Sequence, residues 1–136
     1  METNENDIAV RKMPCTIFLD IDGCILKHHN PNPNKIGIDA YLYNEPEILQ
    51  GVKEKFEEWN KKGHIIILTT ARPENHRSIT EEHLKKFNLT WQLLVMNCGT
   101  GRRFVINDLK PLSSVTTAIA INLKRNEGMK NLDIDF

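Results

Sequence analysis

The stretch Thr16-Ile17-Phe18-Leu19-Asp20-Ile21-Asp22-Gly23-Cys24 is an apolar run that ends in two carboxylates and a glycine. Its β-branched and bulky residues are typical of a strand buried on both faces, as in a parallel sheet. Residues i and i+2 of an extended chain share one side, so Asp20 and Asp22 repel unless a cation or a shared proton intervenes. Gly23 permits a positive φ and a sharp turn. Because open α/β sheets bind ligands at strand carboxyl ends, the stretch predicts a functional site.

The Asp-x-Asp pair also has a simpler interpretation. Asp is common at turns, and an isolated pair of this kind often only caps a loop or a helix. The apolar strand before the pair and the glycine after it favour the functional interpretation. Cys24, which follows the glycine, is interpreted as a small buried filler and not as a nucleophile.

Length and composition exclude several classes of protein. The chain has 136 residues, enough for one domain whose hydrophobic core needs no disulfide bonds or structural metal ions to be stable. Its 18 acidic and 18 basic residues balance, so nucleic acid and anionic membranes are not generally attracted. Cys15, Cys24 and Cys98 form no close pair, which favours a reducing cytoplasm over a disulfide framework or a Cys-rich zinc site. No stretch resembles a signal peptide or a membrane span, so we expect a soluble cytoplasmic protein.

The sequence of the amino-terminal third predicts a flexible segment that is followed by a flap. Residues 1–12 are polar and charged and are expected to be flexible, which leaves a single domain over 13–136. Residues 24–45 are predicted to form a flap beside the Asp-x-Asp pair. Prolines and asparagines exclude a long helix there, while the alternation over 40–43 predicts a short extended piece. Four flap side chains are weaker candidates for substrate contact: His28, His29, Tyr41 and Tyr43.

The middle of the chain predicts a βαβ unit. Residues 45–62 form the clearest helix, since their apolar residues make one stripe opposite lysines and glutamates. Residues 64–70 read as a second buried strand. Strand, helix and strand form a parallel, right-handed unit, which places Thr69 and Thr70 beside the Asp-x-Asp pair.

The remaining chain predicts one more helix and further strands. A helix is expected over 74–87, a third strand over 91–96 and a short fourth strand over 103–106 that ends at Asn107 and Asp108.

Residues 115–123 suit a helix or a strand, and their β-branched content favours a strand. The linker before them is too short for an ordinary helical crossover, so a short helical turn or an antiparallel edge strand stays open. Residues 126–136 are expected to be a turn and a loosely specified tail. The predicted fold is α/β, a Rossmann-like three-layer core with a mostly parallel sheet of about five strands and no sizeable cap domain.

Together these features resemble the haloacid dehalogenase-like superfamily of phosphatases. The strand ends that carry the resemblance are Asp20-x-Asp22, Thr69-Thr70 and Asn107-Asp108. The resemblance covers about residues 15–125, and Thr70-Ala71-Arg72-Pro73 is similar to a pattern that follows the second motif in some members. It implies a small member without a cap, whose open site accepts a bulky substrate or closes by forming a homo-oligomer.

The resemblance also implies residue roles. Asp20 would be the nucleophile that becomes an aspartyl-phosphate, and Asp22 the general acid and base. Thr70, in the Thr70-Ala71-Arg72 turn, would bind the phosphoryl group. Asp20, the Asp22 carbonyl and Asp108 would hold Mg²⁺.

Two positions depart from the superfamily pattern. Asn107 stands where many members have a second acidic residue, so it is either an outer metal ligand or a sign of a weakened site. The phosphate-binding lysine has no clear counterpart. Lys110 and Arg102 are favoured because they flank the end of the fourth predicted strand; the other candidates are Arg103 and Lys86. Arg72 is expected to hold its loop or to meet an anionic substrate, because a guanidinium binds anions with two donors.

The expected function is Mg²⁺-dependent phosphomonoester hydrolysis. A carboxylate cannot readily attack a phosphate dianion unless a cation offsets their repulsion, so the nucleophile needs a metal and phosphate donors. A likeness to small capsule-locus phosphatases favours a phosphorylated small molecule, a sugar phosphate, as substrate. The alternatives are a nucleic-acid end phosphatase, which the neutral charge disfavours, and a binding or regulatory module that has lost turnover.

Overall fold

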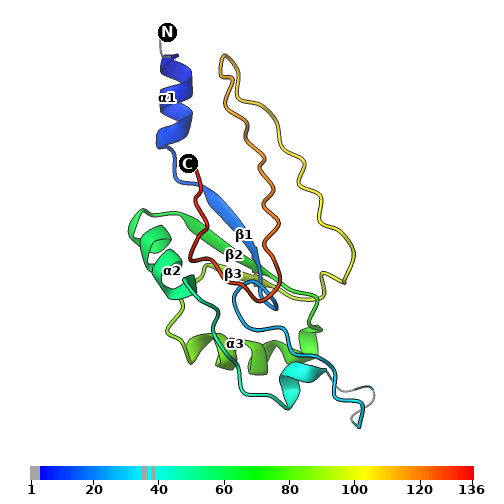
Figure 1. The fold of residues 1–136 in the computed structure, drawn as a ribbon. Helices are drawn as coiled ribbons and strands as arrows, with labels where there is room; N and C mark the ends of the chain where they lie inside the picture. The colour runs from blue at the N-terminus through cyan, green and yellow to red at the C-terminus, as the bar shows by residue number, and fades with distance from the viewer. Residues whose placement is uncertain (1–3, 35–36, 38) are drawn as a thin grey trace.

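The structure is a computed structural model that describes residues 4–34, 37 and 39–136. Figure 1 shows the elements in chain order: α1 (Glu5–Lys12), β1 (Thr16–Asp20), η1 (Ala40–Leu42), α2 (Val52–Lys61), β2 (Ile65–Thr69), η2 (Glu74–His76), α3 (Arg77–Lys85) and β3 (Leu93–Val95). The predicted α/β class and the absence of a sizeable cap agree with this architecture. No helix in the described part of the chain is long and apolar enough to cross a membrane.

The sheet consists of three parallel strands in the order β1-β2-β3. Phe18 lies opposite Ile67, and Ile67 lies opposite Leu93. The predicted βαβ unit is therefore confirmed, and the first three predicted strands each match an observed one within two residues at either end. The sheet of about five strands is not confirmed, because the described residues contain only these three.

The hydrophobic core lies on one face of this sheet. Leu19, Ile66, Leu68 and Leu94 alternate with exposed or half-buried neighbours. They are buried together with apolar residues of both long helices: Val52, Phe56, Trp59 and Leu84. The opposite face carries exposed apolar side chains, with Phe18 at 56% exposure and Leu93 at 53%. The structure thus has one covered face, which corrects the predicted three-layer arrangement for the described residues.

The carboxyl-terminal tail completes the core, which corrects the prediction of a loosely specified tail. Met129 is fully buried, and its backbone N–H donates to the Gln50 carbonyl at 2.7 Å. Gly51 and Gly128 both have positive φ, and a Cβ added at Gly128 would overlap the Gln50 carbonyl oxygen. Two backbone segments therefore approach each other more closely than any side chain allows.

Two predicted segments differ locally from the structure. Residues 5–12 form α1 instead of a flexible segment, because the Asn4 side chain accepts from the backbone N–H groups of Asn6 and Asp7 and caps the helix. The long helix begins at Val52 and not at residue 45. The chain before it pairs with the loop after Asp22, where the Leu49 N–H donates to the Ile25 carbonyl at 2.9 Å. The flap contains η1 in place of the extended piece expected over 40–43.

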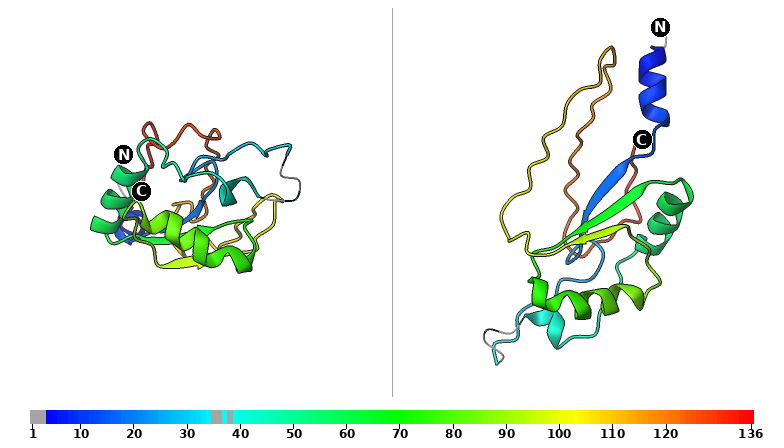
Figure 2. Two further views of the ribbon diagram at one scale, coloured as in Figure 1. Left: turned by 90° about the horizontal axis from the view of Figure 1, so that it is seen from below. Right: turned by 180° about the vertical axis from the view of Figure 1, so that it is seen from behind.

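Residues 102–123, which we call the long arm, contain no helix or strand, although strands were predicted over 103–106 and 116–121. Figures 1 and 2 show the long arm as a two-legged loop that leaves the sheet near the end of β3 and runs in the direction of α1. Its tip is tied to α1, where Ser113 and Ser114 both donate to the Asp7 carboxylate. Its outgoing leg is exposed throughout, and Ile106 is 96% exposed.

Alanine substitutions at two glycines test the close approach of the tail. Gly63 and Gly128 have nearly equal positive φ, 79° and 78°, but a Cβ at Gly63 meets nothing within 4 Å. Gly63→Ala is expected to lower the free energy of unfolding by about 1–2 kcal/mol through left-handed strain alone. Gly128→Ala adds the overlap with Gln50 and should lose about 1–3 kcal/mol more. Urea unfolding measures both, and equal losses would contradict the tail packing.

Candidate active site

The ends of the parallel strands meet at one edge of the sheet. Asp20, the last residue of β1, pairs in register with Thr69, the last residue of β2. Thr69 pairs in turn with Val95 at the end of β3. The geometry brings Asp20 next to the polar end of β2, as the βαβ prediction requires.

A tight turn after Asp20 presents Asp22 at the same edge. Gly23 has a φ of 94°, as predicted, and its N–H donates to the Leu26 carbonyl at 2.7 Å. The Ile21 carbonyl accepts from Cys24, Ile25 and Leu26, while Ile21 itself is fully buried. The turn is therefore anchored in the core.

The tail also supports this turn from outside. Asn126 donates from its backbone N–H to the Gly23 carbonyl at 2.9 Å, and its side chain makes two hydrogen bonds to the backbone of His28. A Cβ at Gly23 would lie 3.3 Å from the Arg125 side chain. The residues that flank Asp22 are thus held by a segment about one hundred positions away in sequence.

Arg72 binds both oxygens of the Asp22 carboxylate. Its Nε donates to Oδ2 at 2.9 Å and its Nη2 donates to Oδ1 at 2.7 Å. Nη1 donates to the Thr80 hydroxyl at 3.1 Å, and the Arg72 side chain is 2% exposed. The predicted loop-holding role of Arg72 therefore takes a specific form, a buried two-donor ion pair with Asp22.

Tyr41 of the flap covers the face of this guanidinium. The Arg72 Cζ lies 3.8 Å from the centre of the Tyr41 ring. The Tyr41 hydroxyl lies 2.5 Å from His76 Nδ1 and 3.3 Å from Asp39 Oδ2. The flap thus contacts the site through a residue that packs on Arg72, and burial raises the pKa of the Tyr41 phenol.

Thr70 lies directly after β2 and is 1% exposed. Its hydroxyl accepts from the Arg72 backbone N–H at 3.1 Å, and its own N–H donates to the Val95 carbonyl at 3.0 Å. Ala71 between them is exposed on the turn. The hydroxyl proton of Thr70 stays available as a donor, because the bond to Arg72 uses only one of its lone pairs.

The Asp20 carboxyl has a perturbed pKa. Its pKa is raised, chiefly because the surrounding protein removes part of its hydration, and the charge of Asp22 adds to the effect. The backbone N–H of Ile21 and the positive charges of Arg103 and His28 act in the opposite direction. A perturbed carboxyl beside a second carboxylate at a strand end is typical of functional sites.

Cys24 lies beside both carboxylates. Burial, together with the charges of Asp20 and Asp22, raises the pKa of its thiol to about 11. A thiol with that pKa stays protonated at neutral pH, and the thiolate is the nucleophilic form. This agrees with its interpretation as a filler.

Four predicted site residues lie on the long arm, away from this network. The guanidinium of Arg102 lies over Phe104, the Asn107 side chain donates to the Thr117 carbonyl, and the Asp108 carbonyl accepts from the Thr117 hydroxyl. Lys110 is exposed. Within the described residues, no three His, Cys, Asp or Glu side chains gather as a metal site, so Asp108 is not joined to the Asp-x-Asp pair here. The roles of these four residues stay predictions.

Sequence reasoning missed several groups that shape the site. Thr80 binds Arg72, and Asn126 supports the turn after Asp22, yet neither stands near a motif in the sequence. Arg103 acts on Asp20, although Arg102 and Lys110 were favoured. Tyr41 was considered only as a substrate contact. The one available signal lay in the helix predicted over 74–87, where Thr80 stands one turn before Leu84, and both are buried.

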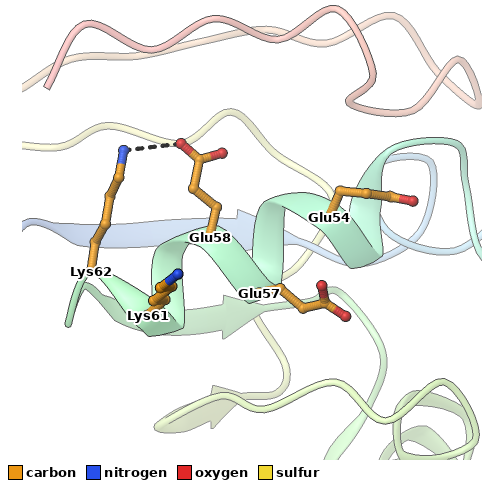
Figure 3. A pocket seen from close by; sticks show the side chains of 5 residues that line it. All are labelled: Glu54, Glu57, Glu58, Lys61 and Lys62. Atoms are coloured by element: carbon orange, nitrogen blue, oxygen red, sulfur yellow. Dashed lines mark hydrogen bonds and ion pairs between the residues drawn. The ribbon is translucent and has the colours of Figure 1, made fainter.

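A hollow on α2 lies apart from the strand ends. Figure 3 shows that it is lined by five charged side chains: Glu54, Glu57, Glu58, Lys61 and Lys62. Lys62 donates to Glu58 at 3.0 Å, an i,i+4 pair of the kind that solvated helix faces carry. This hollow brings together no side chain from the strand ends, so we place the candidate site at Asp20 and Asp22.

Comparison with protein-family models, with curated proteins and with solved structures found no match for this chain.

Asp20→Asn is expected to stabilise the fold at neutral pH. A carboxyl whose folded-state pKa is raised binds its proton more tightly when folded, so it costs stability as pH rises from its ordinary 3.8 through the raised pKa. The amide removes that cost. The gain in unfolding free energy should be complete above the raised pKa and should vanish below about pH 3.8. Urea unfolding across pH measures it, with exposed Asp133→Asn as control, and a gain that persists in acid would contradict the assignment.

Proposed function

We propose that this chain is a Mg²⁺-dependent phosphomonoester hydrolase that acts through an aspartyl-phosphate intermediate on a phosphorylated small molecule, with a sugar phosphate as the first candidate. The observation that carries the proposal is the unequal environment of two carboxylates at one strand end. Asp22 is held by a buried guanidinium, whereas Asp20 has a raised pKa and receives a backbone N–H from Ile21. A buried threonine stands at the end of the next strand.

The two carboxylates divide the chemistry in this proposal. Asp20 attacks phosphorus, and the bond to the leaving oxygen breaks while Asp22 donates a proton to that oxygen. Water then attacks the phosphorus of the aspartyl-phosphate while Asp22 takes a proton from it. The bond between phosphorus and the Asp20 oxygen breaks, which regenerates the Asp20 carboxylate and releases inorganic phosphate. Arg72 uses two of the roughly four acceptor positions of the Asp22 carboxylate, so positions for a proton remain. Thr70 donates a hydrogen bond from its hydroxyl to the phosphoryl group during its transfer.

The residues at the strand end fit Mg²⁺. This ion is commonly bound through one or two carboxylates, with waters and substrate phosphate oxygens completing the octahedron. Asp20 would offer a carboxylate and Asp22 its backbone carbonyl oxygen, and a cation there would relieve the repulsion between the two charges that contributes to the raised pKa of Asp20. When bound, the ion supplies the charge that lets a carboxylate approach a phosphate dianion.

The long arm supplies the rest of the proposed site. In the active form, residues 103–106 pair parallel to the outer edge of β1 and residues 116–121 pair beyond them, which gives a sheet of about five strands. Two observations support this: β1 has no neighbour on that edge within the described residues, and the arm exposes apolar side chains such as Phe104 and Ile106. A parallel strand over 103–106 would bring Asp108 to the carboxyl edge. The outgoing leg runs toward α1 in the structure, so this pairing is a rearrangement of the arm.

A second candidate is a phosphate-binding module without turnover. The observation that favours it is the Arg72 fork, which occupies both oxygens of the carboxylate that must exchange protons. The two candidates share the same site and differ only in phosphate release.

A phosphatase panel tests the proposed reaction. Purified protein with Mg²⁺ should release inorganic phosphate from sugar phosphates faster than from a 3′-phosphorylated oligonucleotide. Asp20→Asn should reduce turnover about a thousandfold or more, because the nucleophile is lost. Asp133→Asn, an exposed carboxylate of the tail, should leave turnover unchanged. No release from any substrate would contradict the reaction, and beryllium fluoride bound with Mg²⁺ would then favour the binding module.

The Mg²⁺ dependence tests the role of Asp108. Asp108→Ala should raise the Mg²⁺ concentration for half-maximal activity by about tenfold or more, since even outer partners of a metal site are worth that much. Asp133→Ala serves as the matched control. An unaltered Mg²⁺ dependence of Asp108→Ala would remove Asp108 from the site and would count against the rearrangement of the arm.

A further inference from the structure

We propose that Tyr41 is a positioning residue, which aims Asp22 by fixing the plane of the Arg72 guanidinium from the flap. This inference rests on the proposed function for its kinetic consequence. Its geometric part, a coupling that runs from Tyr41 through Arg72 to Asp22, stands on observed contacts alone.

Each of the three nitrogens of the Arg72 guanidinium already donates a hydrogen bond. Nε and Nη2 face Asp22, and Nη1 faces the Thr80 hydroxyl. A two-donor fork delivers both bonds only when the guanidinium and the carboxylate are nearly coplanar. The direction of the Asp22 carboxylate therefore follows the plane of the Arg72 group.

A ring across the guanidinium face limits rotation of that plane. Tyr41 lies 3.8 Å from Arg72 Cζ, well inside the range of a cation–π contact. Because Arg72 is almost fully buried, the contact is desolvated on the remaining sides, where such interactions are strongest. A smaller aliphatic side chain would leave that face to water and would free the fork to tilt.

The ring is itself held by its hydroxyl. Tyr41 lies between Asp39 of the flap and His76, the N-terminal cap of α3. The ring of His76 meets the Tyr41 ring edge-on, with centroids 5.6 Å apart. The flap is thus joined to the segment after β2 at the point where Arg72 and Thr80 hold Asp22.

Steady-state kinetics test the positioning role. In Tyr41→Leu, kcat for the best sugar phosphate should fall about fivefold to thirtyfold, the factor that corresponds to a desolvated cation–π contact. KM should change less than about twofold, because a positioning role places Tyr41 on the Arg72 guanidinium and leaves substrate binding to other residues. Tyr41→Phe keeps the ring over the guanidinium but loses the hydroxyl contacts that hold it, so its kcat should lie between those of the parent and of Tyr41→Leu. Leu42→Ala, at an exposed flap residue next to Tyr41, is the control and should keep the parent kcat. A rise in KM with unchanged kcat, or a Tyr41→Phe variant as slow as Tyr41→Leu, would overturn the proposal.

A double-mutant cycle tests the coupling without any enzyme activity. Tyr41→Leu, Asp22→Asn and the double variant are compared by urea unfolding. Tyr41→Leu should lower the folding equilibrium constant about fivefold more in the parent than in the Asp22→Asn background, since the shared Arg72 link is already weakened there. Equal effects in both backgrounds would refute the coupling. Coupling in a protein that releases no phosphate would refute the proposed function alone.

Discussion

The buried ion pair between Arg72 and Asp22 is the interaction on which the candidate site depends. A guanidinium that is 2% exposed must be matched by negative charge and hydrogen bonds, because an unpaired buried charge costs several kcal/mol or more. Asp22, Thr80 and the ring of Tyr41 meet that demand from three separate segments. Removing the Asp22 carboxylate would leave the guanidinium without its charge partner. The strand ends, α3 and the flap all meet on this one side chain.

This pair also explains how two neighbouring carboxylates come to differ. Asp20 and Asp22 are two residues apart, and their charges repel. Arg72 binds Asp22 through two hydrogen bonds and offsets its negative charge. Asp20 instead receives one backbone N–H, from Ile21, and interacts with the more distant charges of Arg103 and His28. The two carboxylates therefore have different hydrogen-bond partners although they stand two residues apart. The ion pair therefore supports unequal roles without a third carboxylate.

Local patterns in the sequence predicted the elements that are stabilised locally. Each of these elements has a pattern that spans only neighbouring residues: the apolar runs of β1 and β2, the turn at Gly23 and the helix over 74–87. The structure matches these predictions closely. What the sequence could not show are contacts across long separations. The tail packs Met129 into the core, the segment before Val52 pairs with the loop after Asp22, and Tyr41 meets Arg72, and none of these leaves a periodic signal. The site was predictable as a pair of strand ends, but not as a network.

The long arm is where the structure differs most from the predicted sheet. Its apolar side chains were predicted as buried strands, yet Phe104 and Ile106 are exposed, and the face and outer edge of β1 are uncovered as well. Water contacts apolar surface on both parts, and burying one against the other would gain about 25 cal/mol per Å². An unpaired strand edge also offers backbone donors and acceptors to a neighbouring extended segment. The charge of Arg103, at the base of the arm, already lowers the pKa of Asp20, so the arm and the strand end are electrostatically linked in this structure.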